Sequence, residues 1–171
     1  MAKAGNTKKE TVKRTVVKKT AVNKPKPQKK ATAKKSIGIK YSDKSAGQPH
    51  LLPIFESLVT LLSPYEKGSI KKRGGKDGQL AMVSEKEVMI GGKIRKELWF
   101  AAALIQKGYV GFYFMPVHSR AEQEQVFAPA LLKCLKGKGC FHLKDNDPVL
   151  YKQIKESLKI GYQLYKERGW L

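Results

Sequence analysis

Two apolar runs joined by a very short connection constrain the fold of this chain more than any other feature. LWFAAALI occupies residues 98–105, YVGFYFM occupies residues 109–115, and only QKG separates them. Runs of this kind around a glycine-containing turn are typical of an antiparallel β-hairpin at the centre of a sheet. The second run is apolar on both of its alternating faces. One face carries Val110, Phe112 and Phe114, and the other carries Tyr109, Tyr113 and Met115. We therefore expect a strand that is covered on both sides, or one whose second face lines a groove.

Helical patterns lie on both sides of this hairpin. Apolar residues recur at helical spacing from Leu51 to Leu62, with Pro53 in the first turn and Pro64 just beyond the end. Near the end of the chain, Asp147 and Pro148 form an N-cap and a first helical residue. The expected buried stripe of this last helix consists of Leu150, Ile154, Leu158, Gly161 or Tyr162, and Tyr165.

The segment between the hairpin and the last helix predicts one short helix and one short strand. QVFAPALLKCLKG predicts a helix closed by Gly137, and CFHLK predicts a strand. The resulting order is helix, strands, helix, strand, helix. It predicts an α+β domain in which an antiparallel β-sheet packs against N- and C-terminal helices.

Charge divides the chain into two parts. Residues 1–40 contain fourteen Lys and Arg, one acidic residue and no aromatic residue, which gives a formal charge of +13 out of the total of +21. The remaining 131 residues contain 21 basic and 13 acidic side chains and therefore carry +8. A segment this basic buries too little apolar surface to offset the backbone entropy of folding. We expect a disordered Lys-rich tail over residues 1–40 and a folded domain over residues 45–171.

The tail resembles in composition the Lys, Ala, Pro and Thr tails of linker histones and histone-like bacterial proteins. Such a polycation binds DNA or RNA without reading sequence, because it releases counterions from the phosphates. The alternative is a solvated or localising tail. The basic residues expected to contact nucleic acid are Lys8, Lys9, Lys13, Arg14, Lys18, Lys19, Lys24, Lys26, Lys29, Lys30, Lys34 and Lys35.

Three basic glycine segments in the domain are candidate anion-binding turns, since backbone N–H groups and lysines can hold an anion together. The alternative is hairpin turns with solvated lysines. On the last helix, Lys152, Lys155 and Lys159 share an outer face, with Glu156 expected to pair with Lys152. The residues of the three segments are Lys71, Lys72, Arg73 and Lys76 in KKRGGK, Lys93, Arg95 and Lys96 in GGKIRK, and Lys136 and Lys138 in KGKG.

The sequence offers little support for catalysis or for a metal. Cys134, Cys140 and His142 supply three ligands at most, whereas structural zinc takes four, so we interpret the stretch as structural and predict no metal and no cofactor. No catalytic motif is present, and the prediction is a non-enzymatic protein. The aromatic residues of the hairpin are interpreted mostly as core. A pocket for a small apolar ligand on the sheet's second face, with His118 at its rim, is the alternative. The aromatic set is Trp99, Phe100, Tyr109, Phe112, Tyr113 and Phe114.

Three motifs in order resemble the YdhG-like family of small bacterial domains: KGYVGFYFMPVH, FAPALLKCLKGKGCFHLK and LYKQIKESLKIGYQLYKERGW. The resemblance covers about residues 45–171 and implies a frataxin-like fold with both terminal helices on one face of the sheet. For some members it implies an intracellular iron carrier. The acidic ridge of frataxin is represented here only by Glu56 and Glu66, so no iron ligand is carried over.

These observations together predict a YdhG-like binding protein that contacts nucleic acid non-specifically through its basic tail. The alternative is an intracellular carrier of iron, another metal or a small ligand. No secretory signal and no apolar run of about 18 residues is present. We expect a cytoplasmic protein with no membrane contact, associated with the nucleoid in a bacterial cell. The oligomeric state does not follow from the sequence.

Overall fold

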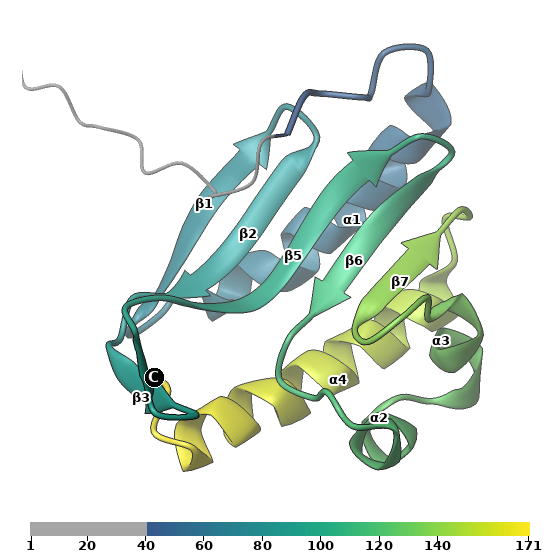
Figure 1. Cartoon of the computed structure of the whole chain (residues 1–171). Helices are drawn as coiled ribbons and strands as arrows, with labels where there is room; N and C mark the ends of the chain where they lie inside the picture. Colours follow the sequence, from purple (N-terminus) through teal and green to yellow (C-terminus); the bar gives the residue numbers. More distant parts are fainter. Residues whose placement is uncertain (1–40) are drawn as a thin grey trace, which may run out of the picture. The chain divides into compact units, whose positions relative to one another are not determined.

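The computed structural model describes residues 41–171, which form an α+β domain with an antiparallel sheet (Figure 1). The sheet has five strands in the order β1-β2-β5-β6-β7, and every neighbouring pair is antiparallel. The predicted α+β class with an antiparallel sheet and helices is confirmed. The disorder predicted for residues 1–40 lies outside the described residues. The strands are Ile70–Lys76 (β1), Gln79–Ser84 (β2), Leu98–Gln106 (β5), Tyr109–Phe114 (β6) and Cys140–Leu143 (β7), with a separate two-stranded ribbon of Val88–Ile90 (β3) and Lys93–Arg95 (β4).

The predicted hairpin is formed by β5 and β6, and β5 is the middle strand of the sheet. Its register pairs Gln106 with Tyr109 at the turn and Ala103 with Phe112 further along. Gly108 has a φ of +82°, a conformation that glycine adopts without the steric cost paid by other residues. The short connection therefore fixes the pairing of the two most apolar strands.

Two helices pack on one face of the sheet. The first is α1 (Leu52–Leu62), preceded by the 3-10 turn η1 (Pro49–Leu51), and the second is α4 (Pro148–Glu167). Figure 1 shows both helices on the same side of the strands. Within residues 41–171 no helix is long and apolar enough to span a membrane. The helices and the sheet enclose the main core, which includes Leu51, Phe55, Leu58, Leu62, Phe100, Phe112, Phe114, Ile154, Leu158 and Tyr165.

The last helix begins as its sequence predicts. The side chain of Asp147 accepts a hydrogen bond of 2.8 Å from the N–H of Val149, and Pro148 occupies the first turn. Of the two candidates for the middle of the buried stripe, Gly161 is buried and Tyr162 is half-buried. A Cβ at Gly161 would overlap the ring of Phe114, so the glycine allows α4 to approach β6 closely.

The prediction of one helix ending at Gly137 is wrong. Two short helices occupy this region, α2 (Arg120–Val126) and α3 (Pro129–Cys134). Phe127 and Ala128 between them have extended backbones, because the residue before Pro129 is sterically kept out of the helical conformation. Gly137 lies in a turn where the N–H of Lys136 donates to the carbonyl of Cys140 at 2.7 Å. KGKG is therefore a connection leading into β7 and not a helix cap.

The second face of the sheet is covered by aromatic side chains instead of helices. A small cluster of buried residues from β2 and β5 lies on this face, with Tyr41, Trp99 and Tyr113 packed against it. The hydroxyl of Tyr41 donates to the carbonyl of Ile105 at 2.9 Å and fixes the start of the described chain on the sheet. The buried residues of this cluster are Ala81, Val83, Ala102 and Leu104.

Candidate anion-binding groove

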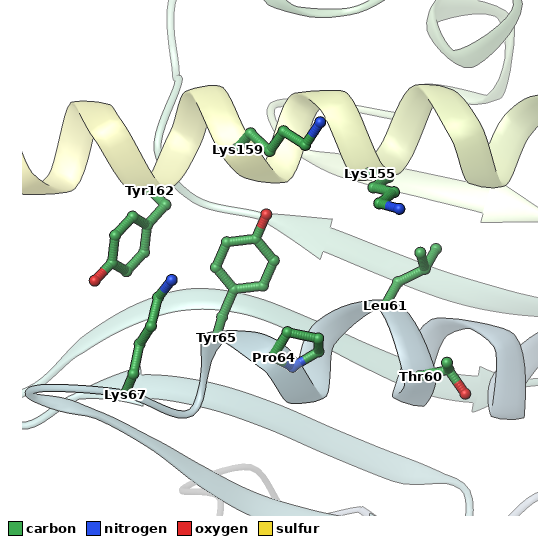
Figure 2. A pocket seen from close by; sticks show the side chains of 8 residues that line it. All are labelled: Thr60, Leu61, Pro64, Tyr65, Lys67, Lys155, Lys159 and Tyr162. Carbon is green, nitrogen blue, oxygen red and sulfur yellow. The ribbon is translucent and has the colours of Figure 1, made fainter.

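A groove of about 490 Å³ lies between the end of α1 and the middle of α4 (Figure 2). One wall comes from α1 and the 3-10 turn η2 (Ser63–Tyr65), and the other wall comes from α4. Pro64 in η2 ends the first helix as the sequence predicts and places Tyr65 toward α4. The lining residues are Thr60, Leu61, Pro64, Tyr65, Lys67, Lys155, Lys159 and Tyr162.

Two tyrosine rings and one lysine lie together at one end of the groove (Figure 2). The centroids of Tyr65 and Tyr162 are 5.7 Å apart, with 53° between the ring planes. The Nζ of Lys67 lies 4.3 Å from the centroid of Tyr162 and 5.5 Å from that of Tyr65. These are distances at which an ammonium group is attracted to the face of an aromatic ring. The groove thus combines a positive charge with flat apolar surface.

The two lysines of α4 that line the groove differ in their partners. The Nζ of Lys159 donates to Glu156 at 2.9 Å, so the predicted pairing of Glu156 with Lys152 is wrong. Lys152 precedes Glu156 by four positions and Lys159 follows it by three, so both lysines are neighbours of Glu156 on the helix surface. Among residues 41–171 Lys155 has no ion-pair or hydrogen-bond partner. Burial, and secondarily the Glu156 carboxylate, raises the pKa of Tyr65, so this ring stays neutral and able to donate a hydrogen bond.

The three basic segments predicted as anion-binding turns do not gather into one site. KKRGGK forms the edge strand β1, and KGKG precedes β7 at the opposite edge of the sheet. GGKIRK belongs to the separate β3–β4 ribbon, where Lys93, Arg95 and Lys96 are exposed. Lys71, Lys76, Lys136 and Lys138 are likewise exposed.

Arg73 is a correction to the predicted set, because its guanidinium is buried in internal contacts. It donates to Glu97 at 2.5 and 2.8 Å and to Glu85 at 3.0 Å, with only 5% of its side chain exposed. These hydrogen bonds raise the pKa of Arg73, so it stays charged. The Nζ of Lys72 is turned toward Ser63 at 3.3 Å. Both cations are therefore engaged in contacts within the domain.

Cys134, Cys140 and His142 do not come together. The thiol of Cys134 lies against the helix-side core and contacts the carbonyl of Ala130 at 3.8 Å, whereas Cys140 pairs with Tyr113 across β6 and β7. Burial raises the pKa of both thiols. Among the described residues no group of three or more His, Cys, Asp or Glu side chains could hold a metal ion. His118 is exposed in a loop, where its N–H donates to Glu122 at 3.3 Å.

Sequence reasoning placed Lys155 and Lys159 on the outer face of the last helix but missed the other half of the groove. Tyr65 and Lys67 follow Pro64, in a segment that had been assigned only to the end of a helix. The signal in the sequence was the alternation of an aromatic and a basic residue just after a helix stop. This pattern indicates a groove only when α4 is known to lie beside α1.

Comparisons of the chain with family models, with curated proteins and with solved structures give no match. The structure defines the class of protein as an α+β domain with two helices on one face of an antiparallel sheet. A cationic, tyrosine-containing groove lies between these helices.

Proposed function

We propose that this chain is a non-enzymatic nucleic-acid-binding protein. Residues 1–40 contact the phosphates of DNA or RNA without reading sequence. The observation that carries the proposal is the concentration of +13 of the total charge of +21 in these forty residues. Each phosphate neutralised by Lys or Arg contributes about −0.9 to the slope of log affinity against log salt. A polycation of this charge therefore binds tightly in dilute buffer and is released by salt.

The folded domain adds a second contact of the same chemistry. Lys67 and Lys155 in the groove carry charges that no carboxylate of the described residues neutralises through a salt bridge. Phosphate groups are attracted to such lysines, and flat bases are attracted to tyrosine rings. The groove is the part of the domain best suited to an anionic ligand with an aromatic portion.

We further propose that the domain is YdhG-like, with a frataxin-like arrangement. Two terminal helices on one face of an antiparallel sheet support this assignment. The protein acts in the cytoplasm of a bacterial cell, in contact with the nucleoid.

A carrier of a small ligand is the second candidate, and the groove favours an anionic ligand over a cation. Three lysines line the groove, and the nearby Glu156 is already paired with Lys159. Hard metal ions such as iron require clustered oxygen ligands instead. Titration of the full chain with ferrous iron tests for a metal carrier, and titration with adenosine monophosphate tests for a carrier of an anionic ligand.

The decisive experiment compares two full-length variants that differ only in residues 1–40. In the first, the twelve basic residues predicted to contact nucleic acid are replaced by Gln. In the second, the same forty residues are placed in scrambled order. Binding to a labelled random-sequence duplex is measured by anisotropy over a salt series.

We expect the Gln variant to lose nearly all affinity and salt dependence, while the scrambled variant keeps both because the contact depends on charge and not on order. Undiminished binding by the Gln variant overturns the proposal. So does a native chain that ignores duplex and single-stranded polymers even in dilute buffer.

A further inference from the structure

The face of the sheet opposite α1 and α4 presents aromatic side chains above a floor of small residues. The floor residues Ala81, Val83 and Ala102 have no exposed surface. Gly111 on β6 extends this floor, and the ring of Tyr113 lies across it. A Cβ at Gly111 would be 2.9 Å from the ring's Cε2. The ring therefore packs directly on the backbone of Gly111 and remains partly exposed.

A second pair of rings lies beside Tyr113, on the part of this face formed by β6 and β7. Tyr109 and His142 are stacked, with 3.7 Å between centroids and 13° between planes. The register pairs Gly111 with His142 and Tyr113 with Cys140, so all of these side chains leave the sheet on one face. Tyr109, Tyr113 and His142 are half-buried. Their spacing is set by the strand ladder, which holds neighbouring strands about 4.8 Å apart.

Three lysines lie near the strands that carry these rings. Lys144 follows His142 by two residues, and the N–H of Lys136 donates to the carbonyl of Cys140 on the same strand at 2.7 Å. Burial, and after it the charges of these two lysines, lowers the pKa of His142. The Nζ of Lys44 donates to the side chain of Gln106 at 2.6 Å, and Gln106 is the partner of Tyr109 in the strand register. Asp43, next to Lys44 in sequence, holds the N–H of Ser45 with its carboxylate at 2.8 Å.

Three fixed rings on an open antiparallel face, bordered by lysines, suit an unstacked base and its phosphate. Base–aromatic stacking tolerates any sequence, because every base has a flat face. In a duplex the bases are already stacked on each other and cannot reach such rings. The rings therefore favour single-stranded nucleic acid over a duplex. Counterion release by lysines alone gives no such preference.

We propose that Tyr109, Tyr113 and His142 form a base-stacking surface for single-stranded nucleic acid, with Lys44, Lys136 and Lys144 on the phosphates. This inference rests on the proposed function, because residues 1–40 supply the larger, non-selective part of the affinity. The stacking surface adds a preference for single strands over duplex, which residues 1–40 do not provide. The stacking surface holds bases, and the basic segment holds backbone of either form.

The test uses the full chain with three labelled probes of equal length: oligo-dT, oligo-rU and a random-sequence duplex. The double variant Tyr109→Leu/His142→Leu removes two rings at similar volume. Tyr109→Phe with His142 retained keeps the stack. Tyr151→Leu changes a half-buried tyrosine on α4, on the helix side of the sheet, and is the matched control.

We expect the double Leu variant to bind single strands about fivefold more weakly or worse, with duplex affinity unchanged. Tyr151→Leu should bind all probes like the native chain, and Tyr109→Phe, which keeps the ring, should bind single strands more tightly than the double Leu variant. The DNA and RNA probes show whether the surface also distinguishes the sugar. Equal losses for single strand and duplex, or no loss for either, overturn the inference.

A second readout does not depend on how well the variants fold. Bromodeoxyuridine in the single strand is photo-crosslinked to the native chain, and the attached peptides are mapped. Attachment at the peptides of β6 or β7 supports the surface, and attachment only within residues 1–40 contradicts it. A native chain that binds neither probe form refutes the proposed function itself. A chain that binds both forms equally refutes only the stacking surface.

Discussion

Gly161 of α4 lies directly against the ring of Phe114 on β6, and no larger residue fits between them without displacement. Overpacking of this kind costs about 1–3 kcal/mol, and alanine recovers about 1 kcal/mol through its higher helix propensity. We therefore expect Gly161→Ala to lower the free energy of unfolding by about 1 kcal/mol. Urea unfolding followed by circular dichroism measures this. Lys166→Ala, exposed on the same helix, is the control and should change stability by less than about 0.5 kcal/mol.

Arg73 on the edge strand β1 contacts two carboxylates, so its removal is expected to destabilise the domain. In Arg73→Leu, Glu85 and Glu97 lose a buried guanidinium that both contact. Breaking a buried ion pair costs about 3–5 kcal/mol, and we expect about 2 kcal/mol here because both carboxylates are partly exposed. Lys71→Leu, at an exposed position of the same strand, is the matched control. Equal stability of the two variants in denaturant titrations would contradict the structural role of Arg73.

The groove predicts a defined change in salt dependence. Lys67→Gln combined with Lys155→Gln removes two cations, so the slope of log affinity against log salt should become shallower by about 1.8 if both contact phosphates. Lys152→Gln lies on the same helix outside the groove and should alter the slope much less. Anisotropy titrations of the full chain at four salt concentrations provide the measurement. A shift of the same size for Lys152→Gln would mean that the groove has no special role.

Both cysteines should react slowly in the folded protein. Burial raises the pKa of Cys134 and Cys140, which reduces the thiolate fraction at pH 8, and the thiolate is the reactive form. We expect thiol–disulfide reagent to react about tenfold or more slowly with the native chain than with the chain in guanidinium. The unfolded chain serves as the internal reference. Native thiols that react at the unfolded rate would show that neither is protected.

Tyr113 should make stability depend on pH only in the alkaline range. Burial, followed by the neighbouring Cys140, raises the pKa of Tyr113 to about 12. Because the folded value exceeds the unfolded value of about 10, this contribution to stability is complete below pH 10 and is lost as the pH rises through about 12. Replacing the residue by Phe should flatten the stability profile between pH 10 and pH 12. An absorbance titration at 295 nm should show one fewer late-ionising tyrosine in this variant.

Local patterns were sufficient for the elements whose signals lie close together in sequence. The spacing of apolar residues around Leu58 and Ile154 identified both long helices, and the three residues after Ile105 identified the hairpin. The break at Phe127–Ala128 departs from the single helix predicted for this segment. Its local signal is Pro129, because the residue before a proline is sterically disfavoured in the helical conformation.

The candidate groove depends on long-range placement that no local pattern contains. Tyr65 and Tyr162 are almost one hundred positions apart in the sequence and meet only because both helices pack on one face of the sheet. The burial of Arg73 likewise depends on where Glu97 falls after the β3–β4 ribbon, which charge patterns cannot show. The nucleic-acid contacts predicted for residues 1–40 remain predictions.

Tyr41 joins the basic segment to the domain by packing on the same face of the sheet as Tyr113. The covalent link therefore begins on the stacking side of the sheet and not on the helix side. If residues 1–40 hold one stretch of a nucleic-acid strand as proposed, its neighbouring bases are confined near this face at an effective concentration far above that in bulk solution. Even weak stacking can then be occupied most of the time. Moving the attachment point to the helix side would remove this local enrichment without changing a single binding residue.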